Sequence, residues 1–329
     1  MNYYLKTKLT EVTAIAHPNF ALIKYWGKAD SRSNMPAMSS ISLTIDSLTS
    51  TTRISINTNS NENLWILNGK GQNDLARINP VLKYLNNISG NNFGCIIKSE
   101  NNFPTSAGLA SSASGIASLV IAYNRLFKLG MSFDQLLKAS MIGSGSAPRS
   151  LLGGFVFLNI EGQPSSQTIL KPSEWPLSII ICITDDKQKI ISSREGMEIS
   201  RKTSPHYQSW LDSNKTDIEI AKLAIEEKNL NRLGEVSEDN CFLMHKVMST
   251  SSPPINYMTE RTNHCIQEIK AARKDGTDLF FTVDAGPQVK IVCNPEDKES
   301  IKDRLINKPY VMKLVEANIG LGARVIDEG

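Results

Sequence analysis

Hydrophobic and polar residues in the first half of the chain follow several strand-like patterns. The segment TTRISINT alternates polar and apolar residues, which is typical of a strand with one buried face. LWILNGK predicts a strand that runs into an Asn68-Gly69 turn, and GCIIKSE predicts a strand that leads into a serine-rich loop. GGFVFLNI and LSIIICIT are apolar almost throughout and predict buried strands.

Helical periodicity is clearest in FPTSAGLASSASGIASLVIAYNRLF, residues 103–127. The helix is expected to end near Gly130, and Ser132 with Gln135 forms a capping-box pattern that opens the next helix. The apolar residues of the first helix recur at the four-three spacing of one helical face, at Leu109, Ala113, Ile116, Val120, Tyr123 and Phe127.

The pattern changes near residue 185. A polar loop, DDKQKIISSREGM, precedes a run of helices, of which one is predicted to begin at Thr216 with Glu219 in capping-box position and another to run through NHCIQEIKAARKDG to Gly276. Two strands follow, LFFTV and VKIVC, joined by DAGPQ. We therefore predict an α+β protein with two domains, residues 1–184 and 185–329, and a ligand cleft between them.

Composition narrows the class of protein. The 329 residues, 40% of them hydrophobic and 21% charged, have the composition of an ordinary folded protein and not of a disordered chain. A net charge of +3 is too small to indicate a nucleic-acid partner. The N-terminus lacks the apolar core of a signal peptide, and the uncharged stretch 101–124 is too rich in Asn, Pro, Ser and Gly for a membrane span. A cytoplasmic protein without a membrane partner is expected.

The five cysteines are scattered, odd in number and form no CxxC pair. Three of them lie in apolar, strand-like runs. Buried free thiols in a reducing compartment are therefore favoured over a disulfide framework or a zinc site.

Small and hydroxyl residues crowd the segment ahead of the helix in 103–127. Thr105, Ser106, Gly108, Ser111 and Ser112 are poor core residues, but they present backbone N–H groups and hydroxyls. The unpaired N–H groups at a helix N-terminus, together with the helix dipole, favour a phosphate. The segment is neither a Walker A loop nor GxGxxG, and a helix that is merely well capped fits its composition equally well.

Three further polar clusters carry candidate chemistry. In IKYWGKAD, Lys24 and Lys28 could converge on an anion, although taken alone the pattern fits two solvated surface lysines better. In GSGSAPRSLLGG, small residues surround Arg149, which suits bidentate capture of a carboxylate or phosphate, and a plain glycine-rich connection fits as well. Asp284 follows the apolar strand LFFTV, where it is either a turn former or a rigidly held general base.

Together these clusters describe an anion-binding phosphotransfer site. They lack the His or Cys arrangement of an acyl-transfer nucleophile, and the sequence has no HxxxH or similar metal cage.

Several motifs also occur in the order and spacing of one known family. ALIKYWGKAD, MPAMSSISLTID, NNFPTSAGLASSAS, GSGSAPRS, SSREGM, SPPINYM and TVDAGPQVKIV make the chain resemble the diphosphomevalonate decarboxylases of the GHMP kinase superfamily. The resemblance covers residues from about 13 to about 294. It implies an N-terminal domain of ribosomal-protein-like topology, a ferredoxin-like C-terminal domain, and an active site in the cleft between them.

The resemblance also implies an activity. Mevalonate 5-diphosphate would be decarboxylated to isopentenyl diphosphate, with ATP and Mg²⁺ required and ADP, phosphate and carbon dioxide released. The partners would be small molecules, and a homodimer is consistent with the family, although no segment of the sequence marks an interface. The sequence identifies no Mg²⁺ ligands and no adenine pocket.

Site residues are carried over only where this sequence matches the motifs. The catalytic residues would be Asp284 as the general base, Lys24 near the reacting hydroxyl, and Arg149 on the C1 carboxylate. The substrate would also contact Tyr25, Lys28, Ser144, Gly145, Ser193 and Met197. The ATP phosphates would be wrapped by Pro104, Thr105, Ser106, Ala107, Gly108, Leu109, Ala110, Ser111 and Ser112.

Three positions depart from the resemblance: Met38 stands where Asn is usual, Ala29 where Arg is frequent, and Pro148 beside the key arginine. The alternatives are a 3-kinase that does not decarboxylate, an enzyme for the monophosphate, another small-molecule GHMP kinase, and a catalytically inactive nucleotide-binding protein. Retention of Lys24, Arg149 and Asp284 together favours the decarboxylase.

Overall fold

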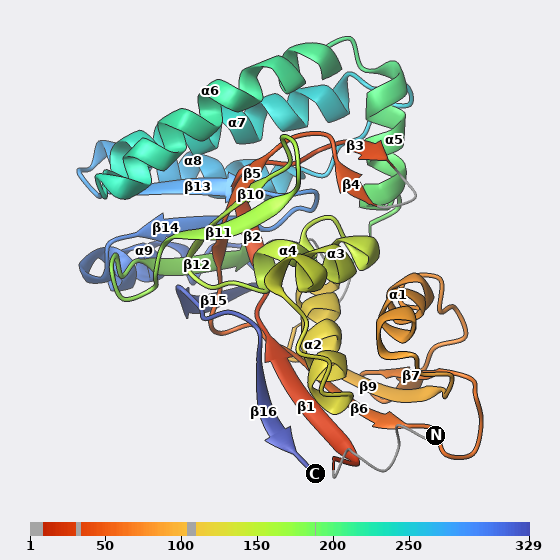
Figure 1. The fold of residues 1–329 in the computed structure, drawn as a ribbon. Coiled ribbons are helices and arrows are strands. Elements are labelled where there is room, and N and C mark those ends of the chain that lie inside the picture. The colour runs from red at the N-terminus through yellow and green to blue at the C-terminus, as the bar shows by residue number, and fades with distance from the viewer. Residues whose placement is uncertain (1–8, 31–33, 104–109, 188) are drawn as a thin grey trace.

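The computed structural model describes residues 9–30, 34–103, 110–187 and 189–329. One end of the molecule is a six-stranded sheet with the order β16-β1-β6-β9-β7-β8, and helix α2 packs across it (Figure 1). Apolar residues of α1 and α2 and the inner faces of β1, β6 and β9 form its core. The elements are β1 (Glu11–Ala16), β6 (Ser50–Ile56), β7 (Leu64–Leu67), β8 (Lys70–Gly71), β9 (Cys95–Asn101), β16 (Arg324–Glu328), α1 (Asn79–Ser89) and α2 (Ser111–Leu126).

Two four-stranded sheets make up the rest of the layers, with the orders β11-β10-β5-β2 and β13-β14-β12-β15. Helices α6 and α7 run side by side, with α7 against β13 and both against β2, and one apolar core joins these helices to strands of both sheets (Figure 1). The bounds are β2 (Asn19–Ile23), β5 (Ser40–Thr44), β10 (Phe155–Asn159), β11 (Ser165–Leu170), β12 (Ser178–Ile183), β13 (Leu279–Val283), β14 (Val289–Cys293), β15 (Lys313–Asn318), α6 (Tyr207–Glu226) and α7 (Leu230–Ser249).

Shorter elements complete the chain. Helices α8 and α9 pack on the third sheet, α3 and α4 lie between the layers, and α5 lies at one end of α6 and α7, beside β3 and β4 (Figure 1). Their bounds are β3 (Lys28–Asp30), β4 (Met35–Pro36), α3 (Phe133–Gly143), α4 (Ala147–Ser150), α5 (Ser193–Thr203), α8 (Glu260–Lys274), the 3₁₀ turn η2 (Pro295–Asp297) and α9 (Lys298–Leu305).

Most of the predicted elements are confirmed. The strands predicted from TTRISINT, LWILNGK, GCIIKSE, GGFVFLNI, LSIIICIT, LFFTV and VKIVC correspond to β6, β7, β9, β10, β12, β13 and β14. Ser132 and Gln135 form the predicted capping box at the start of α3. All five cysteines are buried and free, as predicted.

Two predictions about helix positions are wrong. Thr216 does not begin a helix, because it lies inside α6, which starts at Tyr207. Trp210 and Asn214 are already buried ahead of it, so tertiary packing extends the helix past the local capping signal. The segment SSREGM does not stay in the polar loop, because Ser192 accepts a hydrogen bond from the Glu195 N–H (3.2 Å) and caps α5.

The division at residues 184 and 185 stays a prediction. Strands on either side of it pair across it: β12, which precedes it, pairs with β14 and β15, whereas β16, at the far end of the chain, pairs with β1. In the part of the chain that the structure describes, no helix is long and apolar enough to cross a membrane.

Candidate active site

A cavity of about 490 Å³ lies where the predicted polar clusters meet. It is bounded by the segment after β2, the start of α2, the α3–α4 connection, the start of α5 and the segment after β13. The predicted site residues that line it are Lys24, Tyr25, Lys28, Ala110, Ser111, Ser112, Ser144, Gly145, Arg149, Ser193, Met197 and Asp284. The others, Pro104 to Leu109, lie outside the described residues.

Asp284 and Lys24 form an ion pair on the cavity wall although they are 260 positions apart in the sequence. Lys24 Nζ lies 2.6 Å from Asp284 Oδ1. The Lys24 side chain is 1% exposed, whereas that of Asp284 is 23% exposed and faces the cavity. The main chain of Lys24 is also fixed, because its N–H donates to Asn240 Oδ1 on α7 (2.7 Å).

A second lysine reaches the same carboxylate. Lys290 Nζ, from β14, lies 3.2 Å from Asp284 Oδ2. Burial alone would raise the pKa of Asp284, but the charges of Lys24 and Lys290 outweigh burial and hold that pKa well below its usual range. Lys290 was not predicted, although a lysine inside the apolar strand VKIVC was a signal that could have been followed.

Arg149 is held rigidly in the cavity wall. It is 4% exposed, and its Nε and Nη1 atoms donate to Asn19 Oδ1 (3.1 Å) and Ser40 Oγ (2.5 Å). Burial lowers its pKa to about 10, and the charge of Asp284 partly opposes that shift. A buried cationic guanidinium that is held in place by two hydrogen bonds is suited to a carboxylate.

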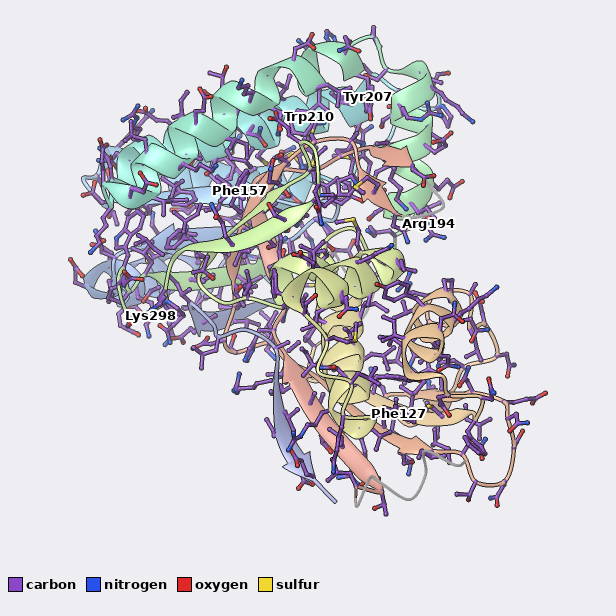
Figure 2. All side chains as sticks on the ribbon, in the orientation of Figure 1. Phe127, Phe157, Arg194, Tyr207, Trp210 and Lys298 are labelled. Atoms are coloured by element: carbon purple, nitrogen blue, oxygen red, sulfur yellow. The ribbon has the colours of Figure 1, made fainter. Side chains whose placement is uncertain are left out.

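A basic group occupies another part of the cavity. Lys28 Nζ and Arg194 Nη2 both donate to Asn34 Oδ1, at 2.5 Å and 3.0 Å, and Arg77 lies on the same wall. Arg194 is on the first turn of α5, at the end nearer α3 (Figure 2). Burial, followed by the charges of Arg194 and Arg77, lowers the pKa of Lys28 to about 8. Cations held this close together fit a ligand with several negative charges.

Lys189 adds a cation beside Asp284. Its Nζ donates to Ser193 Oγ (2.7 Å) and to the Ala285 carbonyl (2.9 Å). Burial lowers its pKa to about 8, against the charge of Asp284. Lys189, Arg194, Arg77 and Asn34 were not predicted. Arg194 lies in the motif SSREGM and could have been found there, whereas the other three acquire their role from the packing around the cavity.

Gly27 allows the segment between the two predicted lysines to turn. Its φ of +129° is one that residues with a side chain rarely adopt, and a Cβ atom there would collide with the hydroxyl of Tyr207. Trp26 is locked beside it, since its Nε1 donates to Ser200 Oγ (3.0 Å) and its carbonyl accepts from Trp210 Nε1 (3.1 Å). Figure 2 shows Tyr207 and Trp210, which lie near the N-terminal end of α6.

The structure also shows the surroundings of the three residues that depart from the family pattern. Met38 is buried in the apolar cluster that contains Trp26 and Trp210. Pro148 occupies the first turn of α4, where its missing N–H group costs nothing. Ala29 is exposed on β3.

The start of α2 brings hydroxyl groups to the cavity. The helix begins at Ser111, with Ala110 as its N-cap residue, and Ser112 Oγ lies 3.4 Å from Ser144 Oγ. Among the residues that the structure describes, no group of three or more His, Cys, Asp and Glu side chains could hold a metal ion. These hydroxyls fit a Mg²⁺ ion that is held chiefly by phosphate oxygens, and not one enclosed by protein ligands.

Comparison with family models decides the family. Residues 16–169 match the diphosphomevalonate decarboxylase-like N-terminal domain, and residues 179–317 match the mevalonate 5-diphosphate decarboxylase C-terminal domain. The chain belongs to the diphosphomevalonate decarboxylase family. The resemblance drawn from the motifs is thereby confirmed.

Individual members of the diphosphomevalonate decarboxylase family are similar to this chain over most of its length. The diphosphomevalonate decarboxylase of Candida albicans is 33% identical over 305 residues, covering 86% of this chain and 84% of its own. The crystal structure of mevalonate diphosphate decarboxylase from Staphylococcus aureus has a TM-score of 0.90 at 33% identity, over 97% of this chain and 98% of its own. MDDEF, solved in complex with MVAPP, AMPPCP and magnesium, has a TM-score of 0.89 at 34% identity, over 97% and 99%. The predicted α+β fold of the GHMP kinase type is confirmed.

Proposed function

We propose that this chain catalyses the ATP-dependent decarboxylation of mevalonate 5-diphosphate to isopentenyl diphosphate. Family membership supports the reaction class. The observation that carries the assignment is the Lys24–Asp284 ion pair, which shares one cavity with the buried guanidinium of Arg149 and a separate basic group. A reaction that needs a base, a carboxylate site and a polyphosphate site requires this combination.

The cavity offers a place for each end of the substrate. Arg149 would hold the C1 carboxylate, because its guanidinium is buried, charged and fixed by Asn19 and Ser40. Lys28 and Arg194 would hold the diphosphate, whose charge suits closely spaced cations. Tyr25, Ser144, Gly145, Ser193 and Met197 would contact the remainder of the substrate, since all of them line the same cavity.

ATP would enter beside the start of α2. Its phosphates would be wrapped by Pro104 to Ser112, of which Ala110, Ser111 and Ser112 line the cavity. MDDEF with AMPPCP and magnesium supports a nucleotide and a divalent cation in this family. Mg²⁺ bound to the ATP phosphates would neutralise part of their charge during transfer.

The chemistry follows from the placement of Asp284. The 3-hydroxyl oxygen would bond to the γ-phosphorus of ATP as the bond between that phosphorus and the bridging oxygen breaks and ADP leaves. Asp284 would orient the hydroxyl and take its proton, and Lys24 would offset charge on the transferred group. The new 3-phosphate would then leave with the electron pair of the C3–O bond. The electrons of the C1–C2 bond would form the alkene, and the carboxylate at Arg149 would be released as carbon dioxide.

The test is a single reaction with two products. Purified protein is incubated with ATP, Mg²⁺ and mevalonate 5-diphosphate, and ADP and carbon dioxide are followed together. Equal release of both is expected. ADP without carbon dioxide would indicate a 3-kinase, and turnover only with the monophosphate would indicate a phosphomevalonate decarboxylase. ATP binding with no product from either substrate would indicate an inactive nucleotide-binding protein.

Asp284→Asn provides the residue-level test. It keeps the shape of the side chain but removes the base, so kcat should fall by about 10²–10⁴-fold. Lys70→Arg, at an exposed position on β8 outside the cavity wall, is the control and should keep normal kcat. Near-normal turnover of Asp284→Asn would refute the assignment of Asp284. A homodimer and a cytoplasmic location remain predictions of the resemblance and of the sequence.

A further inference from the structure

Both carboxylate oxygens of Asp284 form ion pairs with lysines. Lys24 Nζ lies 2.6 Å from Oδ1, and Lys290 Nζ lies 3.2 Å from Oδ2. Lys24 and Asp284 line the cavity, whereas Lys290 is 1% exposed and is not part of the cavity wall that the described residues form. Lys290 therefore holds the carboxylate from the protein side.

We propose that Lys290 is a positioning residue for the reaction: by holding Oδ2, it fixes the plane of the Asp284 carboxylate and keeps Oδ1 beside Lys24 at the cavity. The proposal rests on the proposed function, in which Asp284 receives the proton of the 3-hydroxyl. Nothing in the reaction requires Lys290 to touch the substrate.

The backbone around the pair makes Lys290 a rigid support. Asp284 follows directly after β13, so its side chain can rotate about its own torsions unless both oxygens are held. Lys290 lies on β14, which is hydrogen-bonded on one side to β13 and on the other to β12. Its register partners are Thr282 on β13 and Ile181 on β12, so β14 is paired on both sides at this position. A group fixed by a paired strand sets geometry more precisely than a group on a loop.

The second lysine also changes the local charge during the reaction. One carboxylate between two ammonium groups leaves a single net positive charge beside the cavity. When Asp284 takes the hydroxyl proton, that net positive charge doubles. The increase coincides with the formation of the 3-phosphate, which it stabilises.

Other ionisable groups surround Asp284 and must be separated from Lys290 in a test. They are Arg149 on α4, Lys189 ahead of α5, and Cys241 and His245 on α7. Burial, together with the charge of Lys24, lowers the pKa of His245 to about 4, and burial raises the pKa of Cys241. The pKa values of Lys189 and Arg149 are about 8 and about 10. Between pH 5 and 7, Lys189 and Arg149 therefore stay mostly charged, and His245 and Cys241 stay mostly neutral.

The experiment compares Lys290→Met with the wild type over that pH range. Methionine keeps most of the length of the side chain and removes its charge. At pH 7, kcat is expected to fall by about 10- to 100-fold, as for a misplaced catalytic group, while KM for both substrates changes little. The deficit should deepen toward pH 5, because a carboxylate with one cation fewer is more readily protonated. Lys290→Arg, which restores a cation, should recover much of kcat.

Arg273→Met is the matched control. Arg273 pairs with Glu238, a buried carboxylate that also accepts from the Phe281 N–H on β13 (3.1 Å), so the variant removes an ion pair next to the same strand without touching Asp284. Its kcat deficit, if any, should be independent of pH. If Lys290→Met does not fold, Lys290→Leu gives the same comparison, since it also removes both the donor to Oδ2 and the charge.

Normal turnover of Lys290→Met, or a rise in KM as large as the fall in kcat, would overturn the proposal. These results differ from failure of the proposed function. That failure would appear in the wild type, as ADP without carbon dioxide or as no product.

Discussion

Lys28 and Lys189 are partly stripped of water in the cavity, and this sets their ionisation. Burial is the main cause that lowers the pKa of each to about 8. Both are therefore charged below pH 8 and lose their charge above it. An anionic substrate binds the charged form, so its affinity is full below that pH and declines as the pH rises.

KM for mevalonate 5-diphosphate should accordingly rise several-fold between pH 7 and pH 9. Lys28→Arg should flatten the rise, because a guanidinium stays charged over this range. Steady-state kinetics at fixed ionic strength measures the effect, and Lys70→Arg, at an exposed position, should leave the profile unchanged. A wild-type KM that stays level across this range would show that neither lysine contributes its charge to binding.

Gly27 gives a second prediction for a single residue. Gly27→Ala should lower the free energy of unfolding by about 1–3 kcal/mol through backbone strain, with a further loss from the collision with Tyr207. It should also raise KM, since Gly27 lies between Trp26 and Lys28. Urea unfolding measures the first effect and kinetics the second.

Gly69→Ala separates the two causes. Gly69 also has a positive φ, +74°, but a Cβ atom there would meet nothing within 4 Å. Gly69→Ala should therefore lower the free energy of unfolding through backbone strain alone. If both variants lose the same stability, the contact with Tyr207 contributes nothing.

At the scale of elements, α2 combines a structural and a binding role at different turns. Ser118 Oγ lies 2.7 Å from Thr52 Oγ1 on β6, in a fully buried contact between helix and sheet. Two turns earlier, Ser112 lines the cavity. The same residue type thus serves packing at one end and ligand contact at the other.

Alanine at these two serines should have opposite effects: one variant should lose stability and the other should lose affinity for ATP. Ser118→Ala should cost about 1–3 kcal/mol of stability, because it leaves a buried hydroxyl partner without one of its bonds, and should leave KM for ATP unchanged. Ser112→Ala should raise KM for ATP with little loss of stability. Urea unfolding and ATP titrations of both variants test the pair. An unchanged KM for ATP in Ser112→Ala would remove Ser112 from the ATP site.

Local patterns predicted the elements better than they predicted the site. The strands and the Ser132 capping box depend on periodicity and on hydrogen bonds between near neighbours, which a sequence displays. The start of α6 was misplaced because the burial of Trp210 is a tertiary effect. Lys290 was missed although a lysine inside the apolar strand VKIVC was a signal, and its carboxylate partner, Asp284, directly follows the strand paired with it.

The candidate site was located by the family motifs and not by physical reasoning on single clusters. Taken alone, Lys24 and Lys28 fitted solvated lysines, yet Lys24 is almost completely buried against Asp284. That contact joins residues 260 positions apart, so it follows only from the complete fold. Burying the charge of Lys24 costs free energy, and the ion pair with Asp284 offsets that cost. The two residues are too far apart in the sequence for a local pattern to show the pair.

At the scale of the whole molecule, the last strand of the chain completes the first sheet. β16 pairs with β1 along its length, from Val12 with Glu328 to Ile15 with Arg324, and Arg125 on α2 forms an ion pair with Glu328 (2.6 Å). β16 is thus separated in sequence from the sheet that it completes. Without it, β1 would be an open edge with unpaired N–H and C=O groups.

Deletion of residues 324–329 should therefore lower the midpoint of urea unfolding and promote self-association at high protein concentration. Activity measured at low concentration and low temperature should persist, because no residue of β16 lines the cavity that the described residues form. Glu328→Gln is the control: its ion pair is exposed to solvent and contributes little to stability, so this variant should behave almost as the wild type. Sedimentation velocity and urea unfolding distinguish the outcomes. If the deletion variant matches Glu328→Gln in both, strand pairing by β16 contributes nothing beyond the ion pair, and the first sheet is stable without the end of the chain.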